Sequence, residues 1–455
     1  MSVDYIYGIA FFCRRVTLSE KPESVNCNSR TRFTSPKSES GVPREAMEKE
    51  KTDLISQISL DINEVKDLDI LLERILSHVR KFFSADAGSI YLKEGDRLKF
   101  SYTQNDTLRR RLGSQKKLIY NTFFVPINNQ SISGYVAKNR MVVNIPDVYE
   151  MEGGEPYSFD SNFDSISKYR TRSMITVPMT NQRGEVLGVM QVINGQDEKG
   201  NIVPFKQSDE SLIKYFATTA GLALERAQMT RNILMRMISM AELRDPKETG
   251  AHVNRVASYS VEIYESWARK FGIPLSEVEK NRDILRMAAM LHDVGKVAIS
   301  DLILKKPARL TEEEYEIIKM HTYLGAKLFG DMSSEFDFIA AEVALNHHEK
   351  WDGTGYPGHI DPRTESALPG LAATNGRPRP KKGEEIPPFG RIVAVADVYD
   401  ALCSRRSYKE PWKEDRILEE MQSSSGTHFD PEVIEAFFSC LDVLKSIASK
   451  YPDKD

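Results

Sequence analysis

An apolar stripe at helical spacing begins near residue 68 and is the first regular pattern in the chain. Its members recur three or four positions apart, so they share one face and predict an amphipathic helix. The stripe consists of Leu68, Leu71, Leu72, Ile75, Leu76, Val79 and Phe82.

Short apolar and β-branched runs follow this helix and predict an antiparallel sheet. Residues 89–92 and 98–100 flank Glu94-Gly95-Asp96, a turn sequence typical of a hairpin. Further strands are predicted at 142–144, 173–179 and 186–194. A helix, antiparallel strands and a closing helix define an α+β sensor-like domain, which we place at residues 55–226.

A long uninterrupted helix is predicted for residues 209–243, which contain no proline. Apolar residues fall at seven-residue steps along it, the spacing of a coiled coil, although Arg231 interrupts the seam. Two interpretations stay open: a parallel homodimer helix that carries the sensor state onward, or a helix packed against its own domains. The seam residues are Ile213, Ala217, Ala220, Leu224, Ala227, Leu234, Ile238 and Ala241.

Composition and charge argue against two classes of partner, nucleic acids and membranes. The chain has 455 residues, enough for several domains, and a net charge of -4 without a polybasic stretch, so no nucleic-acid partner is expected. Its four cysteines form no CxxC pair, which favours the reducing cytoplasm. No apolar run approaches the roughly 20 residues that cross a bilayer, and no membrane partner is expected.

Residues 1–50 are predicted to form a disordered arm, because residues 14–46 are rich in Ser, Pro, Asn and charge. The alternative is a translation start at Met47, in which case residues 1–46 would not belong to the native protein.

Histidines and carboxylates in the C-terminal half suggest a metal centre. Imidazole nitrogen and carboxylate oxygen together suit iron, manganese or zinc, and the lack of thiolate argues against a structural zinc site. Any one of these histidines alone is more often a helix residue with a satisfied hydrogen bond. Adjacent His-Asp and His-His pairs on a helix would point about 100° apart, which favours a multi-metal centre. The candidate ligands are Glu248, His252, His292, Asp293, His321, His347, His348 and Asp397.

The segments around these ligands are predicted to be helical. Thr311 and Glu314 form a capping box ahead of a helix that carries His321, and Asp430-Pro431 begins a helix that ends near Ser449. We therefore predict an all-α bundle over residues 232–453, with the metals at its centre.

The motifs ETGAH, HDVGK, HHEKWDGTGYP and ADVYDAL, in this order, resemble those of the HD-GYP domain, a branch of the HD metal-dependent phosphohydrolases. The resemblance implies a phosphodiesterase that hydrolyses cyclic di-GMP to pGpG, with further cleavage to GMP left open. It also implies two or three divalent ions, with iron and manganese favoured, and Glu248 stands where part of the family supplies a carboxylate for a third metal.

The same resemblance assigns residues to the reaction. Asp293 would hold the metal pair, and Lys296, one turn further on, would neutralise phosphate or protonate the leaving oxygen. A signalling protein could bind the GYP loop. Ser407 stands where the family commonly has proline. Substrate contacts are expected from Lys296, Tyr356, Asp400, Arg406 and Lys409.

Residues 359–381 interrupt a junction that is direct in the family. Two interpretations stay open, a mobile surface loop or a basic lid over an anionic substrate. The basic residues of the insert are Arg363, Arg377, Arg379 and Lys381.

The N-terminal domain resembles a GAF domain. Asn194, Phe205, Asp209 and Glu210 match the signature of cyclic-nucleotide-binding GAF modules, but Gly195 stands where that signature has a lysine. An unknown small ligand, or none, is therefore expected. The predicted architecture is a GAF domain joined by a long helix to an all-α HD-GYP bundle. Two alternative functions are a catalytically quiet nucleotide- or partner-binding regulator and an HD phosphohydrolase for another nucleotide.

Overall fold

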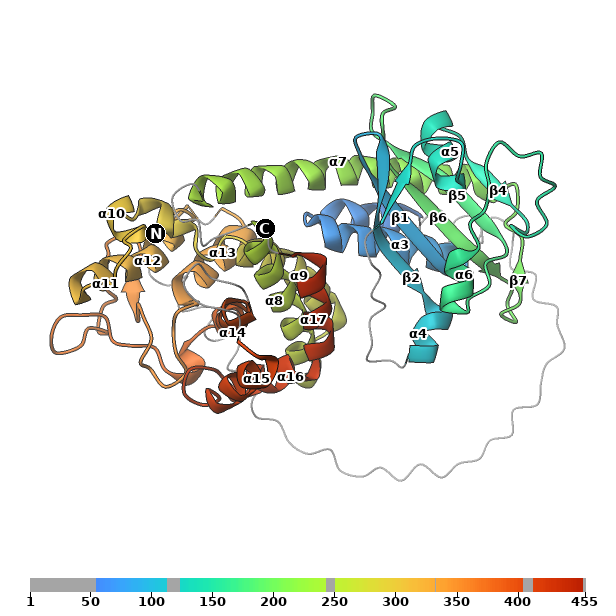
Figure 1. Cartoon of the computed structure of the whole chain (residues 1–455). Coiled ribbons are helices and arrows are strands. Elements are labelled where there is room, and N and C mark those ends of the chain that lie inside the picture. The colour runs from blue at the N-terminus through green and yellow to red at the C-terminus, as the bar shows by residue number, and fades with distance from the viewer. Residues whose placement is uncertain (1–54, 113–122, 243–249, 332, 404–411, 453–455) are drawn as a thin grey trace, which may run out of the picture. The chain divides into compact units, whose positions relative to one another are not determined.

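An antiparallel sheet organises the N-terminal part of the chain (Figure 1). The computed structural model describes residues 55–112, 123–242, 250–331, 333–403 and 412–452. The predicted hairpin is confirmed, because β1 pairs with β2 around Gly95, whose φ of +64° suits glycine. The strand order is β3-β2-β1-β6-β5-β4, and β7 pairs with β6. The strands are β1 (Ala85–Glu94), β2 (Arg97–Asn105), β3 (Phe124–Pro126), β4 (Val143–Ile145), β5 (Met174–Thr180), β6 (Val186–Gln196) and β7 (Ile202–Val203).

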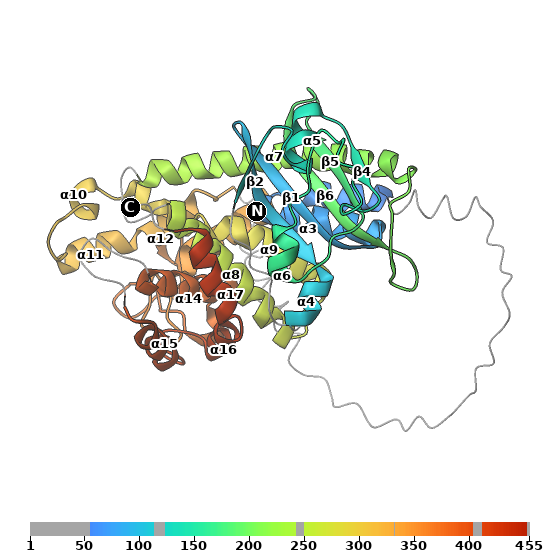
Figure 2. The ribbon, with the colours of Figure 1, turned by 45° about the vertical axis from the view of Figure 1, so that its right-hand side comes forward.

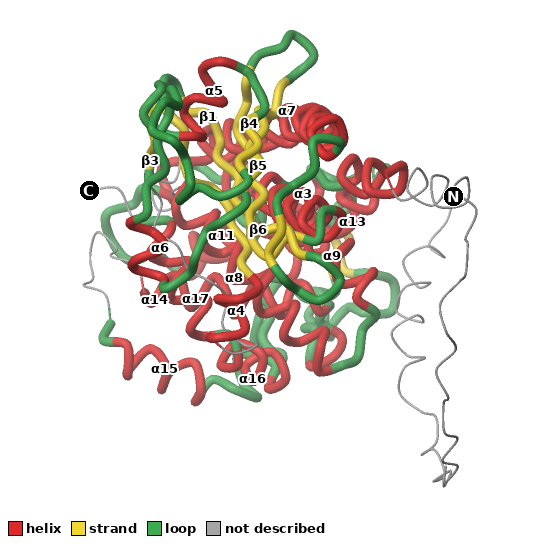
Figure 3. The backbone as a smooth tube through the Cα atoms, turned by 90° about the vertical axis from the view of Figure 1, so that its right-hand side faces the viewer, coloured by secondary structure: helices red, strands yellow, loops and turns green. Residues whose placement is uncertain are grey.

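Each face of the sheet has its own apolar core. Ile90 and Leu92 of β1 face the helices α3 (Leu68–Phe82) and α7 (Asp209–Glu242), whereas Tyr91 between them faces α5 (Ile132–Asn139). This alternation follows from the two-residue period of a strand. Figure 3 shows the strands with α3 beside them. The predicted α+β layout is confirmed, and the short helices α4 (Asp106–Leu112) and α6 (Asn162–Ser167) add to it.

Helix α7 is continuous, as predicted, and extends from the sheet to the C-terminal helices (Figure 2). The seam predicted from its seven-residue steps is buried within this chain. Ile213 and Leu224 pack on the sheet and α3, and Leu234 and Ile238 join the core of the C-terminal helices. The second interpretation, a helix packed against its own domains, therefore describes this face of α7.

The C-terminal part is helical, as predicted, and its largest core lies between α8, α9, α13, α14 and α16. Among the described residues, none of the helices has both the length and the apolarity to cross a membrane. Two 3₁₀ helices, η1 (Val294–Ala298) and η2 (Gly383–Glu385), and one small hairpin complete the part. The helices are α8 (Gly250–Lys270), α9 (Leu275–Ala289), α10 (Asp301–Leu304), α11 (Glu312–Lys319), α12 (His321–Lys327), α13 (Glu335–Asn346), α14 (Pro388–Cys403), α15 (Glu414–Ser423), α16 (Pro431–Ser439) and α17 (Leu441–Lys450).

The predicted helix starts are confirmed, but both helices end earlier than expected. Thr311 and Glu314 form the capping box of α11, yet this helix ends at Lys319 and His321 begins α12. Asp430 caps α16 by accepting a hydrogen bond from the amide of Glu432 (2.9 Å). The chain then breaks at Cys440, where α16 gives way to α17. Periodicity does not reveal such breaks, because the end of a helix also depends on tertiary packing.

Candidate metal centre

The structure gathers seven of the eight predicted ligands into two groups. In each group, one candidate ligand atom of every residue lies within 4.8 Å of the others. Glu248 lies outside the described residues. The first group is Asp293, His321, His347 and His348, and the second is His252, His292 and Asp397.

Helix ends, rather than helix faces, position the adjacent pairs. His292 and Asp293 lie in the turn between α9 and η1, and His347 and His348 follow the last residue of α13. The prediction that placed both pairs on helices was wrong on this point. His292 nevertheless belongs to the second group while Asp293 belongs to the first, so the two residues of this pair fall in different groups.

Asp293 lies between the two groups. Its Oδ1 is 3.0 Å from Nε2 of His321 and 3.5 Å from Nε2 of His347. Its Oδ2 is 3.3 Å from Nε2 of His292, which in turn is 3.9 Å from Oδ1 of Asp397. One carboxylate therefore faces ligands of both groups, as a bridging ligand of two metals would.

A glycine allows this approach. A Cβ atom at Gly295 would lie 1.9 Å from the carbonyl oxygen of His321 and 2.5 Å from the amide nitrogen of Gly325. Because that position tolerates no side chain, η1 can pack directly on α12, and Asp293 reaches His321. The glycine of the HDVGK motif is therefore needed for this close packing, which the sequence pattern alone did not indicate.

The surroundings fix the tautomers of four histidines. Nδ1 of His292, His321 and His347 lies 2.8, 2.6 and 3.0 Å from the backbone carbonyl three residues earlier. A carbonyl only accepts hydrogen bonds, so each Nδ1 carries the proton and each Nε2 keeps its lone pair. Nδ1 of His252 is likewise 2.8 Å from Oδ2 of Asp400.

These lone pairs fit a metal. Nε2 of His321 and Nε2 of His347 are 3.4 Å apart, and both face Oδ1 of Asp293. Three electron-rich atoms converge in a buried place, which is unfavourable until a cation lies among them. The set of imidazole nitrogens and carboxylate oxygens suits iron, manganese or zinc and does not select one of them.

The protonation states also suit ligands. Burial lowers the pKa of His347, and burial together with His347 and His321 holds the pKa of His348 well below its usual value. Burial alone would raise the pKa of Asp293, but Lys296 and His292 hold it well below its usual range. The imidazoles of His347 and His348 are therefore neutral and the carboxylate of Asp293 is charged, as metal binding requires.

Lys296 lies at the centre, as predicted. Its Nζ donates to Oδ2 of Asp293 at 2.7 Å, across three residues of the chain. Side chains at this spacing share one side of a helical turn, which is why the motif alone was enough to place it.

Asp400 occupies a different place from the one expected. It is fully buried, it accepts two hydrogen bonds from Arg255 (2.6 and 2.9 Å), and it contacts Nδ1 of His252. This position lies behind a metal ligand and supports a role in orienting His252, not a contact with substrate. The sequence motif includes Arg255, three residues after His252, but sequence reasoning gave it no role.

Tyr356 stacks beside the first group. Its ring centroid is 4.9 Å from that of His348, and Nζ of Lys319 lies 5.5 Å above the ring. Burial raises the pKa of Tyr356, so its hydroxyl stays neutral. Arg406 and Lys409, the other expected substrate contacts, lie outside the described residues.

The insert contains a hairpin of β8 (Ile360–Asp361) and β9 (Ser366–Ala367). Arg379 pairs with Glu385 at 2.6 Å, Arg377 is 3.6 Å from Glu316, and Lys381 is buried against Asn346. These basic side chains already have partners within the chain, which weakens the case for a lid that closes on an anionic substrate.

The departure in the GAF signature has a packing reason. A Cβ at Gly195 would lie 3.0 Å from the ring of Phe205, so a lysine there would push against this ring. Asn194 is buried and donates to the hydroxyl of Tyr169 (2.8 Å), and Asp209 accepts from the amide of Lys206 (2.8 Å). The signature residues thus stabilise local structure without the lysine.

A cavity of about 590 Å³ opens elsewhere in the N-terminal domain. Its lining includes the rings of Tyr149, Tyr157 and Phe159 and one carboxylate, Glu155.

Two kinds of family model match the chain. Residues 67–224 match the GAF domain, and residues 249–402 match the HD domain, with a second HD domain model over 373–433. The chain therefore joins a GAF domain to an HD domain, in agreement with the predicted fold.

Several relatives of this chain are named as phosphodiesterases. A 3'3'-cGAMP-specific phosphodiesterase 2 of Vibrio cholerae is 34% identical over 57% of this chain and 47% of its own length. A cyclic di-GMP phosphodiesterase of Vibrio cholerae is 34% identical over 63% and 53%, and one of Thermotoga maritima is 38% identical over 48% and 50%. The chain spans about half the length of these relatives.

Proposed function

We propose that this chain is a metal-dependent phosphodiesterase that hydrolyses cyclic di-GMP to linear pGpG and is regulated by its GAF domain. The observation that carries the proposal is the pair of ligand groups that share Asp293. The names of the relatives support cyclic dinucleotides as the substrate class.

The described residues have separable roles in this proposal. Two metal ions, held by the two ligand groups, would supply a nucleophile at neutral pH and relieve charge on the phosphoryl oxygens. Lys296 holds a proton and a positive charge next to Asp293, where it can neutralise phosphate or protonate the leaving ribose oxygen. Tyr356 offers a neutral hydroxyl and an aromatic face beside His348. Glu248 is the proposed additional ligand for a third ion, and iron and manganese are the proposed metals.

Turnover and metal content together test the proposal. The chain is purified without oxygen, its iron, manganese and zinc are measured per chain, and it is incubated with cyclic di-GMP. We expect at least two ions per chain and conversion to pGpG, and the chromatogram will show whether GMP follows. A metal-replete chain without turnover would contradict the proposal and favour the quiet regulator, for which the GYP loop (residues 353–357) offers a partner surface.

A second substrate deserves the same assay. Three relatives are named 3'3'-cGAMP-specific phosphodiesterases, so this dinucleotide is run beside cyclic di-GMP at equal concentration. A higher kcat/KM for 3'3'-cGAMP would assign the chain to that substrate without changing the metal chemistry.

A homodimer is proposed through the outer face of α7. Six exposed apolar side chains there form a stripe within an arc of roughly 80° at 100° per residue, and the exposed Arg226 lies within the same arc. Because the buried seam is occupied within the chain, this stripe is the surface that a second copy would cover. Its residues are Tyr215, Leu222, Met229, Ile233, Met237 and Met240.

Ile233→Arg is therefore expected to turn a dimer into a monomer in light scattering at about 10 µM. Charge at the centre of an apolar helix pair is costly to bury. Met141→Arg, at an exposed apolar residue of the N-terminal domain, is the control and should stay dimeric. A monomeric wild-type chain would rule the dimer out.

A further inference from the structure

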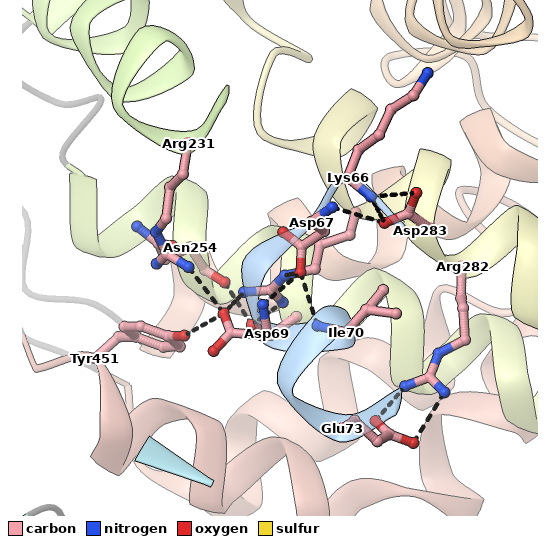
Figure 4. A network of polar contacts seen from close by, with 12 residues as sticks. Lys66, Asp67, Asp69, Ile70, Glu73, Arg231, Asn254, Arg282, Asp283 and Tyr451 are labelled. Atoms are coloured by element: carbon pink, nitrogen blue, oxygen red, sulfur yellow. Dashed lines mark hydrogen bonds and ion pairs between the residues drawn. The ribbon is translucent and has the colours of Figure 1, made fainter. Parts of the chain in front are cut away.

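Asp69, at the start of α3 in the GAF domain, is bound by three other helices (Figure 4). Its Oδ2 accepts from Arg231 of α7 (3.0 Å) and from Arg286 of α9 (2.5 Å). Lys450, at the end of α17, donates to Oδ1 (3.2 Å), and the hydroxyl of Tyr451 donates to Oδ2 (3.3 Å). Residues Leu54–Asp455 form one compact unit, and this carboxylate lies where the elements of its two domains meet.

Charge makes these contacts strong. Burial alone would raise the pKa of Asp69, but the cations of Lys450, Arg286 and Arg231 hold it well below its usual range. Arg286 is itself buried and also pairs with Asp67 at 2.9 Å. Removing the charge of Asp69 would take one of two carboxylate partners from the buried Arg286, which is more costly than losing a surface pair, whereas Lys450 is exposed to solvent.

Neighbouring contacts dock the same end of α3 on α9. Oδ1 of Asp283 accepts from the backbone amide of Asp67 (2.8 Å), and Arg282 pairs with Glu73 (2.7 Å). Both acceptor and donor come from α9, the helix that precedes the turn with His292 and Asp293. The start of α3 therefore cannot move without disturbing the helix that leads into the metal centre.

A second route runs from Asp69 to His252. Tyr451 donates its hydroxyl to Asp69, and its backbone carbonyl accepts from Arg255 of α8 (2.8 Å). Arg255 holds Asp400 through two hydrogen bonds, and Asp400 holds Nδ1 of His252 (2.8 Å). The route joins the GAF domain to a metal ligand through hydrogen bonds and the backbone of Tyr451. Its members Arg255 and Asp400 are buried.

We propose that Asp69 is a positioning residue for the metal centre, through which the state of the GAF domain sets the orientation of His252. The proposal deepens the proposed function, on which it rests, by naming the link between sensor and site. Tyr451, Arg255 and Asp400 are the intermediate members of this link. A change in the GAF domain that moves the start of α3 releases Tyr451, loosens Arg255 and lets His252 turn away from its metal.

The test uses the full chain, loaded with Mn²⁺, and needs no substrate. The variants are Asp69→Asn and Tyr451→Phe, which removes only the hydroxyl link, and the control is Asp61→Asn, an acid of the same domain near His78. The rate at which EDTA strips Mn²⁺ is measured together with hydrogen exchange of α8 and β1. Altered support of a metal ligand changes affinity by about 10- to 100-fold.

We expect about tenfold faster loss of Mn²⁺ in Asp69→Asn, a smaller increase in Tyr451→Phe and no change in Asp61→Asn. Exchange should rise in α8 but not in β1. Added to Arg255→Lys, either variant should have less than its full effect, because both act on one route. Wild-type rates of Mn²⁺ loss in Tyr451→Phe, or equal loss of protection in α8 and β1, would overturn the proposal.

Failure of the proposed function would show differently. A wild-type chain without turnover, but with the expected changes in Mn²⁺ loss, would reject the phosphodiesterase and keep the link. Normal turnover of the wild-type chain, together with unchanged Mn²⁺ loss in both variants, would keep the phosphodiesterase and reject the link.

Discussion

Asp293→Ala is expected to lower kcat for cyclic di-GMP by on the order of a thousandfold or more, since the variant loses charge stabilisation at the reacting centre. One oxygen of this carboxylate faces His321 of the first group, and the other faces His292 of the second group and Lys296, so a single substitution disturbs both groups. It also removes the carboxylate that accepts a hydrogen bond from Lys296. Metal analysis of the purified variant should show less than the wild-type number of ions per chain.

Two further variants make this result specific. Asp293→Asn keeps the shape and one oxygen but no charge, and it should lose most of the metal as well. Asp301→Ala, at an exposed carboxylate of α10, controls for the loss of an acid nearby and should keep full turnover. Full metal content together with wild-type turnover in Asp293→Ala would reject Asp293 as the shared ligand.

Local sequence signals were enough to predict much of the fold. The hairpin around Gly95 and helix α3 follow from periods of two and 3.6 residues, which depend only on neighbouring positions. The seven-residue seam of α7 also predicted a buried stripe, but it could not predict what covers it. In the structure, residues of the same chain cover this stripe. The stripe therefore carries no information about contact with a second copy of the chain.

For the metal site, too, the sequence predicted which residues take part but not how the fold positions them. Motif order named seven ligands that the structure brings together, because residue type at fixed spacing carries the chemistry. It did not show that His292 and His347 follow helix ends, since a helix boundary depends on tertiary packing. Resemblance placed Asp400 near the substrate, but its burial against Arg255 is set by contacts 145 residues apart in the chain. No local pattern reports such a contact.

Lys296→Met is expected to lower kcat for cyclic di-GMP by about a hundredfold while the metal content stays at the wild-type value. Methionine has a similar length but no charge and no proton to donate. Because Lys296 contacts Asp293 by one hydrogen bond and is not itself a ligand, the ion-binding groups remain complete. Lys305→Met removes a lysine that pairs with Asp301 at 3.2 Å on the exposed side of α10, and it should leave kcat unchanged.

A substrate with a better leaving group separates the two roles of Lys296. The ribose oxygen of cyclic di-GMP needs a proton as it departs, whereas the 4-nitrophenolate of bis(4-nitrophenyl) phosphate departs without one. If Lys296 donates this proton, Lys296→Met should lose about a hundredfold on the dinucleotide and little on the nitrophenyl ester. An equal loss on both substrates would show that the lysine acts as a charge on phosphate, because both esters carry that charge. If Lys296→Met keeps the wild-type kcat on both substrates, Lys296 has no role in the reaction and its contact with Asp293 is only a structural ion pair.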